Sequence, residues 1–275
     1  HGPYHPPERW VETFASGERG PWAPRVPGYQ RRIDPRTGGV QLDLRPYLDA
    51  YDAAIRHVDE LVGRLLAAVD LERTIVLIVS DHGETLDEEP RRYFPLDHGG
   101  RPYEEQSRAV AVLAAPDLAP RRIAAQVGLV DLAPTLYPLL GVEAPELMDG
   151  IDLGPLLRGE SDRGKRAEFT TASALDFIMK HSGRQVDESR PVHSVRIDGY
   201  KLIVYPGVDG EDFVELYALD TDPGEIEDLA ATDPERVTSG LALLDRWDSR
   251  RHDARPPIEL DPEVRERLES LGYVF

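Results

Sequence analysis

A short apolar run that ends in an acid and an imidazole constrains this chain more than any other feature. Residues 75–79 are all apolar, so a strand formed by them has no polar face and is expected to be buried on both sides. The run stops at Asp81-His82-Gly83. In open α/β sheets, binding and chemistry occur at the carboxyl ends of strands. A carboxylate and an imidazole at that place are suitable ligands for a divalent cation.

The same residues also have a purely structural interpretation. Asp81 can cap a turn while His82 lies exposed, and the dipeptide alone fits both interpretations equally. His98 lies in a loop before two glycines, which allow close approach to a ligand, but a surface histidine fits that loop as well. A histidine at position 1 has no expected role on its own. The buried strand in front of Asp81 favours the functional interpretation.

Composition excludes several classes of partner. The 275 residues carry 51 acidic and 32 basic side chains, a formal net charge of −19. This charge argues against a nucleic-acid surface and against binding to anionic membranes. The chain contains no cysteine, so it has no disulfide, no zinc–thiolate site and no cysteine nucleophile.

The pattern along the chain predicts helix alternating with strand, followed by short strands. Apolar residues at three- and four-residue steps predict an amphipathic helix over 46–69, and a second apolar run predicts a buried strand over 109–115. Residues 123–140 are largely helical in pattern, with Pro134 in a first turn and Gly141 as the C-cap. Four short strands are predicted at 168–173, 192–197, 200–205 and 214–219, followed by a helix at 234–247. Asp198-Gly199 predicts a hairpin turn between the second and third of these strands. The expected fold class is α/β: a mixed, largely parallel sheet flanked by helices, plus a small C-terminal antiparallel subdomain.

The ordered succession of these motifs resembles the sulfatase family of the alkaline-phosphatase-like superfamily. The segments that carry the resemblance are 1–7 (His-Gly-Pro-Tyr-His-Pro-Pro), 51–59, 78–84 (Ile-Val-Ser-Asp-His-Gly-Glu), 98–105, 129–136, 149–153, 199–202, 215–225 and 268–273. Each segment is weak alone, but together they cover almost the whole chain in order. The resemblance implies three parts: residues 1–165 as the C-terminal part of the α/β catalytic domain, 166–260 as an antiparallel β plus helix subdomain, and 261–275 as a helical tail.

The resemblance also implies a mechanism for hydrolysis of sulfate esters. Sulfatases use a formylglycine nucleophile, made from Cys or Ser in a Cys/Ser-x-Pro-x-Arg motif, beside a divalent cation. Asp81 and His82 resemble one pair of the metal ligands. His98 resembles the position that contacts the anionic ester oxygens, and His1 resembles a histidine beside the leaving-group oxygen, a general acid. The expected cation is Ca²⁺, with Mn²⁺, Mg²⁺ or Zn²⁺ as alternatives because imidazole suits transition metals better.

One departure from the family pattern changes the expectation for this chain. It contains no Ser/Cys-x-Pro-x-Arg motif and no early Asp-Asp pair, which in the family lie upstream of the segment that matches His1. The chain therefore resembles the C-terminal portion of a sulfatase without its nucleophile, and we expect residues 1–275 alone to be inactive. An incompletely covered sheet also predicts association into oligomers.

Three functions stay open at this point. The first is a sulfuric ester hydrolase whose substrate is a small-molecule or glycan sulfate ester. The second is a phosphodiesterase or phosphonate monoester hydrolase of the same superfamily, which the missing nucleophile would distinguish. The third is a non-catalytic binding domain. Neither nucleic acid nor a membrane is expected as a partner, and the sequence does not fix a compartment, although members of the family are often periplasmic or secreted.

Overall fold

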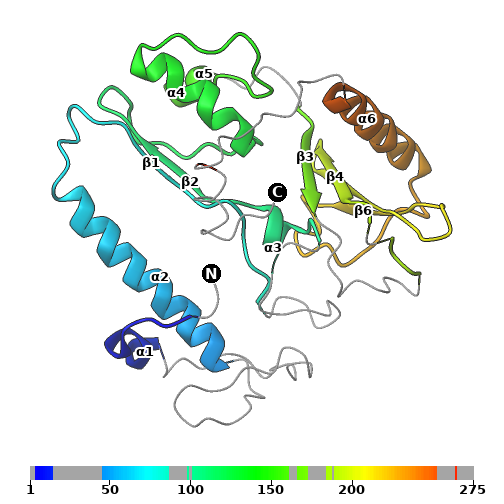
Figure 1. Ribbon diagram of the computed structural model, residues 1–275, viewed down its shortest axis with the longest axis horizontal. Helices are drawn as coiled ribbons and strands as arrows, with labels where there is room; N and C mark the ends of the chain where they lie inside the picture. The colour runs from blue at the N-terminus through cyan, green and yellow to red at the C-terminus, as the bar shows by residue number, and fades with distance from the viewer. Residues whose placement is uncertain are drawn as a thin grey trace.

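The fold contains a two-stranded sheet and a four-stranded sheet, with helices beside both (Figure 1). The computed structural model describes residues 4–14, 45–86, 98, 101–160, 166–172, 184–187, 189–252 and 264. The predicted tail at 261–275 lies outside these residues except for Val264. Among the described residues, no helix combines the length and the apolar character that a membrane crossing requires. The elements are α1 (Glu8–Phe14), α2 (Arg45–Leu66), β1 (Val76–Val79), α3 (Glu104–Ser107), β2 (Ala111–Ala114), η2 (Leu129–Asp131), α4 (Leu132–Leu140), α5 (Gly154–Arg158), β3 (Glu168–Ala172), β4 (Val192–Ile197), β5 (Tyr200–Tyr205), β6 (Phe213–Ala218) and α6 (Pro234–His252).

The long helix α2 is the amphipathic helix predicted from the apolar spacing, and its existence is confirmed. Its buried side includes Leu48 and Ala53. The short helix α1 packs against α2, and was not predicted, because residues 1–46 have little periodicity. Two side chains of α1 hold the pair together: Arg9 and Trp10 both donate hydrogen bonds to the Glu60 carboxylate, at 2.8 and 3.2 Å.

Both predicted apolar strands exist, but they pair antiparallel. β1 and β2 form a two-stranded sheet in which Val76 faces Ala114 and Val79 faces Ala111. The expectation of a largely parallel sheet is therefore not met among the described residues, where every strand pair is antiparallel. A continuous apolar run indicates a strand, but it carries no information on the direction of the neighbour. The direction is defined by the contacts between the two strands, which the pattern of each strand alone does not show.

The expectation that these strands are buried on both faces is also wrong for the described residues. Val79 is 46% exposed and Val112 is 54% exposed, although both are apolar. A two-stranded sheet has few neighbours to cover it, so apolar side chains stay accessible on both faces: Val112, which pairs with Ile78, lies on one face and Val79 on the other.

The four-stranded sheet runs in the simple order β3-β4-β5-β6, all antiparallel. The four strands were predicted from their β-branched and aromatic content, with bounds that agree within one residue. The predicted hairpin between β4 and β5 is confirmed, because Asp198 and Gly199 have φ of 55° and 74°. Such positive φ values at both central residues define a turn that favours Asp-Gly.

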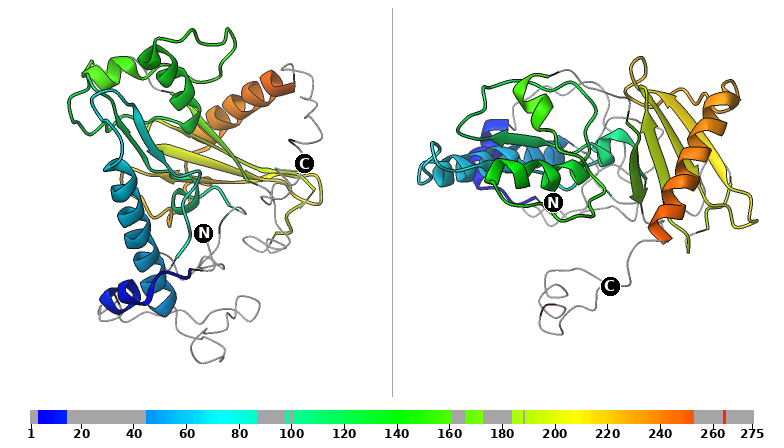
Figure 2. Two further views of the ribbon diagram at one scale, coloured as in Figure 1. Left: turned by 60° about the vertical axis from the view of Figure 1, so that its left-hand side comes forward. Right: turned by 90° about the horizontal axis from the view of Figure 1, so that it is seen from above.

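This sheet has a hydrophobic core on each face. On one face, α6 packs against Val195, Leu202 and Leu216, with Leu244 contributed by the helix itself. On the other face, aromatic side chains of the sheet pack around Tyr103, which immediately precedes α3. Figure 2 shows the sheet with α6 at one end of the molecule and α2, β1 and β2 at the other, with α3 between them. Tyr103 thus connects the two halves of the fold.

The segment before α4 is less helical than its sequence pattern predicted. Residues 123–128 are extended or bent, and α4 begins at Leu132 after a short 3₁₀ turn. The cause is Asp131, whose fully buried carboxylate accepts hydrogen bonds from the backbone of Gly128 and Ile151 and from both terminal nitrogens of Arg166. Pro134 in the first turn and Gly141 at the C-cap, with φ of 67°, are confirmed.

Candidate active site

The candidate site begins where β1 ends. The backbone N–H of Ser80 donates to the Val110 carbonyl at 3.0 Å, and the Val110 N–H donates to the Ser80 hydroxyl at 2.9 Å. These two bonds close the β1–β2 ladder, and the chain leaves the sheet at Asp81. The Asp81-His82 pair therefore lies at the carboxyl end of a strand, as the sequence predicted.

Asp81 and His82 present their donor atoms side by side. Asp81 is 88% exposed in its side chain, and its Oδ1 lies 3.6 Å from Nε2 of His82. The same oxygen accepts the backbone N–H of His82 at 3.0 Å. The other ring nitrogen of His82, Nδ1, lies 2.6 Å from the Gly83 carbonyl oxygen. Since a carbonyl can only accept, this contact assigns the proton to Nδ1, which leaves the Nε2 lone pair of the neutral ring free to bind a cation.

Gly83 lets α3 pack directly behind this pair. A Cβ at position 83 would lie 2.1 Å from the carbonyl oxygen of Glu105, closer than any side chain permits. The Gly83 N–H donates to the backbone carbonyl of Gln106 at 2.8 Å, and the side-chain amide of Gln106 donates to the hydroxyl of buried Thr85 at 2.8 Å. The loop that carries Asp81 and His82 is therefore held by two consecutive residues of α3, Glu105 and Gln106.

Glu84 brings two distant parts of the chain to the site. One carboxylate oxygen lies 3.1 Å from Nδ1 of His98, and the other accepts the Tyr4 hydroxyl at 2.8 Å. The side chain of Glu84 is only 7% exposed, so its carboxylate has little contact with water. Tyr4 packs edge-on against Tyr51 of α2. No pattern in the sequence predicts this role of Tyr4, which lies three positions after His1.

The two histidines singled out in the described part of the chain come together. The rings of His82 and His98 are stacked, with centroids 4.1 Å apart and planes inclined by 25°. His1, the third histidine expected at the site, lies outside the described residues. Asp81, His82 and His98 thus gather at one place, supported by Glu84.

Two donor atoms of types that bind divalent cations lie next to each other at this site. Asp81 Oδ1 and His82 Nε2 are 3.6 Å apart, a separation that two ligands of one ion can bridge with small movements. In the described part of the chain, no group of three or more acidic, histidine or cysteine side chains is arranged to bind a metal. The pair fits a cation as two ligands of an incomplete shell.

Two family profiles match this chain. The sulfatase family profile matches residues 1–142, and a profile described as N-sulphoglucosamine sulphohydrolase, C-terminal, matches residues 102–243. The first profile covers more than half of the 275 residues. The chain belongs to the sulfatase family.

Individual relatives are similar at moderate identity. Arylsulfatase K of Xenopus laevis is 29% identical over 201 residues, which are 71% of this chain and 35% of the relative. The Delta 4,5-hexuronate-2-O-sulfatase of Bacteroides thetaiotaomicron is 28% identical over 256 residues, 88% of this chain and 50% of the relative. The chain therefore spans about a third to a half of the length of these curated relatives.

Solved structures support the fold. The phosphonate monoester hydrolase of Agrobacterium radiobacter superposes with a TM-score of 0.59 at 24% identity, covering 77% of this chain and 42% of the hydrolase. At that identity the likeness concerns the fold alone, which is the alkaline-phosphatase-like α/β architecture of the sulfatases.

Proposed function

We propose that this chain is part of a hydrolase of sulfate esters, with a sulfated small molecule or glycan as substrate. The observation that carries the proposal is the convergence of Asp81, His82 and His98 at the end of β1, in a chain of the sulfatase family. The name of the hexuronate sulfatase, a relative that this chain matches over 88% of its residues, favours a sulfated glycan as the substrate class.

Each side chain has a role in this proposal. Asp81 and His82 hold a divalent cation, which supplies the positive charge that polarises the ester oxygens. His98 contacts the anionic ester group, and Glu84 holds its Nδ1 while Tyr4 holds the second oxygen of Glu84. His1 is proposed as the general acid on the strength of the family resemblance. Ca²⁺ is the proposed cation, with Mn²⁺ as the alternative that the imidazole favours.

The nucleophile is proposed to lie outside these 275 residues. The chain has no cysteine and no Ser-x-Pro-x-Arg motif from which a formylglycine could be made. The purified chain is therefore expected to release no product from an aryl sulfate. Turnover of the aryl sulfate by the purified chain, abolished in the His82→Ala variant, would overturn the proposal that the nucleophile lies outside these residues.

A metal titration tests the cation site without depending on turnover. Adding Mn²⁺ to the histidine-labelled chain is expected to broaden the NMR signals of His82 and His98 first, because a paramagnetic ion acts on nearby nuclei. The Asp81→Asn variant is expected to need more Mn²⁺ for the same effect, whereas Asp117→Asn, an exposed acid beyond β2, is the matched control. Equal broadening in the Asp81→Asn variant and in the unmodified chain would refute the proposed site.

A second candidate is a hydrolase of phosphodiesters or phosphonate monoesters. The observation that favours it is the imidazole of His82 beside Asp81, a donor set suited to Mn²⁺ or Zn²⁺. The test uses a protein that includes the nucleophile. Full occupancy by Mn²⁺ or Zn²⁺, together with turnover of an aryl phosphonate, would favour this candidate over the sulfatase.

A further inference from the structure

The short helix α3 lies between the proposed metal-binding loop and the four-stranded sheet. It has only four residues, and its N-cap residue, Tyr103, makes no side-chain cap hydrogen bond. A single helical turn is not stable alone, because forming the first turn costs more conformational entropy than its one or two hydrogen bonds recover. The position of α3 must therefore be fixed by contacts with other parts of the fold.

One side of α3 fixes the loop. The contacts already described join Gln106 to Gly83 and Thr85, and the Glu105 carbonyl fills the space that a side chain at position 83 would need. A displacement of α3 would therefore displace Gly83, the residue next to His82.

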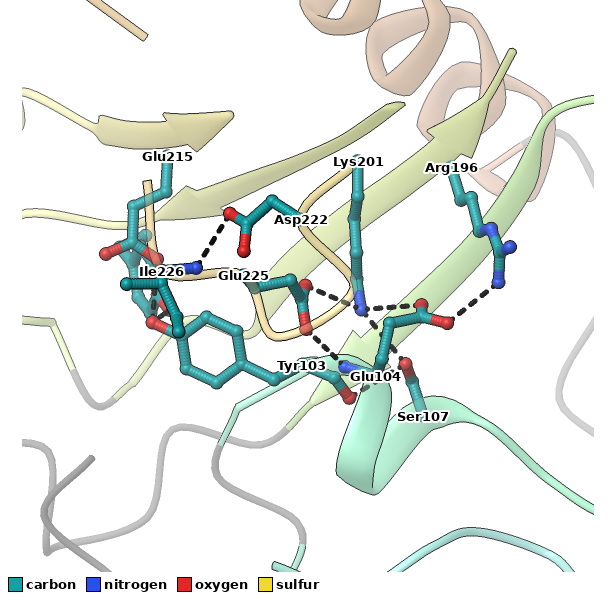
Figure 3. A network of polar contacts seen from close by, with 10 residues as sticks. Tyr103, Glu104, Ser107, Arg196, Lys201, Glu215, Asp222, Glu225 and Ile226 are labelled. Atoms are coloured by element: carbon teal, nitrogen blue, oxygen red, sulfur yellow. Dashed lines mark hydrogen bonds and ion pairs between the residues drawn. The ribbon is translucent and has the colours of Figure 1, made fainter. Parts of the chain in front are cut away.

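The other side of α3 is held by a buried group of charges, which we call the Lys201 cluster: Glu104, Arg196, Lys201 and Glu225. The ammonium of Lys201 lies 3.1 Å from Glu104 Oε1 and 3.2 Å from Glu225 Oε1, and donates to the Ser107 hydroxyl at 3.1 Å (Figure 3). Arg196 donates to the second oxygen of Glu104 at 2.8 Å. Two cations and two carboxylates thus neutralise one another.

Two members of the Lys201 cluster are shielded from water: Lys201 is 2% exposed and the side chain of Glu225 is fully buried, whereas the side chain of Arg196 is 36% exposed. Buried charges of this kind persist only when each is paired, and the loss of one leaves its partners uncompensated. The positions of the side chains in the Lys201 cluster are therefore more tightly constrained than those in a surface ion pair.

Glu225 also replaces the missing cap of α3. Its Oε2 accepts the backbone N–H of Glu104, the first residue of the helix, at 2.6 Å. The residue reaches this position from a tight turn with φ of 52°, which non-glycine residues rarely adopt. Asp222 stabilises that turn by accepting the N–H groups of Ile226 and Glu227 at 2.8 and 2.9 Å, as Figure 3 shows for Ile226.

A second contact anchors the residue in front of α3. The Tyr103 hydroxyl donates to Glu215 at 2.8 Å, and Tyr205 donates to the same oxygen at 3.1 Å. Burial, together with the neighbouring Tyr205 and the Glu215 carboxylate, raises the pKa of Tyr103 well above its usual value, so its hydroxyl stays a donor at neutral pH. Both ends of α3 are thus fixed to the four-stranded sheet.

We propose that Lys201, Glu104 and Glu225 are positioning residues for the Asp81-His82 pair, acting through α3 and Gly83. The four-stranded sheet then has a part in the reaction, although none of its residues lies at the site: it sets the place of the loop that binds the cation. This inference rests on the proposed function for its consequence in catalysis, but the mechanical coupling from Lys201 to Gly83 can be measured separately.

Amide hydrogen exchange of the whole chain tests the coupling. In the Lys201→Met variant, and in the milder Glu104→Gln variant, the Gly83 amide is expected to exchange about tenfold faster, because its acceptor on α3 is no longer fixed. Exchange within β5 and β6 is expected to stay unchanged. The matched control is Arg190→Met, which breaks the exposed bidentate pair of Arg190 and Asp212, residues that lie just before β4 and β6 of the same sheet, and should leave Gly83 unaffected.

The outcomes separate the coupling from the proposed function. Faster exchange at Gly83 with an intact sheet, together with weaker Mn²⁺ broadening of His82, supports the inference. Uniformly faster exchange through β5 and β6, or unchanged exchange at Gly83 in the Glu104→Gln variant, overturns it, because the cluster would then act on stability alone. If Gly83 responds but Mn²⁺ never reaches His82 in the unmodified chain, the coupling stands and the metal site is refuted.

Discussion

The imidazole rings of His82 and His98 are stacked with their centroids 4.1 Å apart, although His82 lies shortly after β1 and His98 is much further along the chain. The stack is fixed from both sides. His82 is held by the Gly83 carbonyl and His98 by Glu84, so the relative position of the two rings depends on two hydrogen bonds to Nδ1 atoms. A disturbance of either bond should separate the rings.

Replacement of Glu84 by alanine should release His98 and Tyr4 together. Each loses one hydrogen bond in a half-buried environment, so the free energy of unfolding is expected to fall by about 1–3 kcal/mol. The nuclear Overhauser contacts between the rings of His82 and His98 are expected to disappear. Glu72→Ala, at an exposed turn, is the control and should change stability by less than about 0.5 kcal/mol. Ring contacts that survive in Glu84→Ala would contradict the role given to Glu84.

Two glycine-to-alanine substitutions should have opposite effects on stability. At Gly83 the added methyl meets the Glu105 carbonyl, and overpacking of this kind costs about 1–3 kcal/mol. At Gly63, inside α2, the methyl meets nothing within 4 Å, and alanine should stabilise the helix by about 0.5–1 kcal/mol. Urea unfolding of both variants checks this pair of predictions. An equal effect at the two positions would show that α3 does not pack against Gly83 as described.

The sequence predicted those features that depend on neighbours along the chain. The apolar spacing of α2, the β-branched strands β4 and β5 and the Asp198-Gly199 turn all have local causes, and all are confirmed. The same holds for the placement of Asp81 and His82 after β1, because the end of an apolar run can be read directly.

Features that depend on contacts between distant segments were not predictable from one sequence. The antiparallel pairing of β1 and β2 joins two separate segments, and neither apolar run indicates the direction of its partner. The contact of Glu84 with His98 and the hydrogen bond from Tyr4 join three separate segments, and nothing in the composition of any one of them indicates the other two. The existence of α3 likewise depends on Lys201 and Glu225, more than ninety positions away in the sequence.

Stability below pH 4 should depend on Asp131. Burial alone would raise the pKa of this carboxyl, but the hydrogen bonds from Arg166 and from the backbone of Gly128 and Ile151 outweigh it, so the pKa lies below its usual value of 3.8. A lowered pKa in the folded state gives stability that is fully present above pH 3.8 and is lost as the pH falls through the folded-state pKa.

The Asp131→Asn variant should remove that dependence. It is expected to lower the free energy of unfolding at pH 7 by about 3–5 kcal/mol, because Arg166 loses its buried partner. Its stability should also fall less steeply below pH 3.8 than that of the unmodified chain. Glu168 acts in the other direction, because burial raises its pKa above 4.5. Its contribution to the free energy of unfolding is therefore lost as the pH rises above 4.5, outside the range in which Asp131 titrates. Parallel curves for the two chains below pH 3.8 would rule out this role for Asp131.

Association should depend on the accessible apolar face of the two-stranded sheet. Val110 and Val112 are 59% and 54% exposed, and apolar side chains grouped on an open strand favour contact with another surface. The chain is therefore expected to sediment with a mass that rises with concentration in the micromolar range. Threonine at both positions keeps the β-branched shape and adds a hydroxyl, so the double variant should associate more weakly with little change in fold. Val208→Thr, an equally exposed valine in the loop between β5 and β6, is the matched control. A single monomer peak for the unmodified chain, with a cooperative melt, would mean that this face does not drive association.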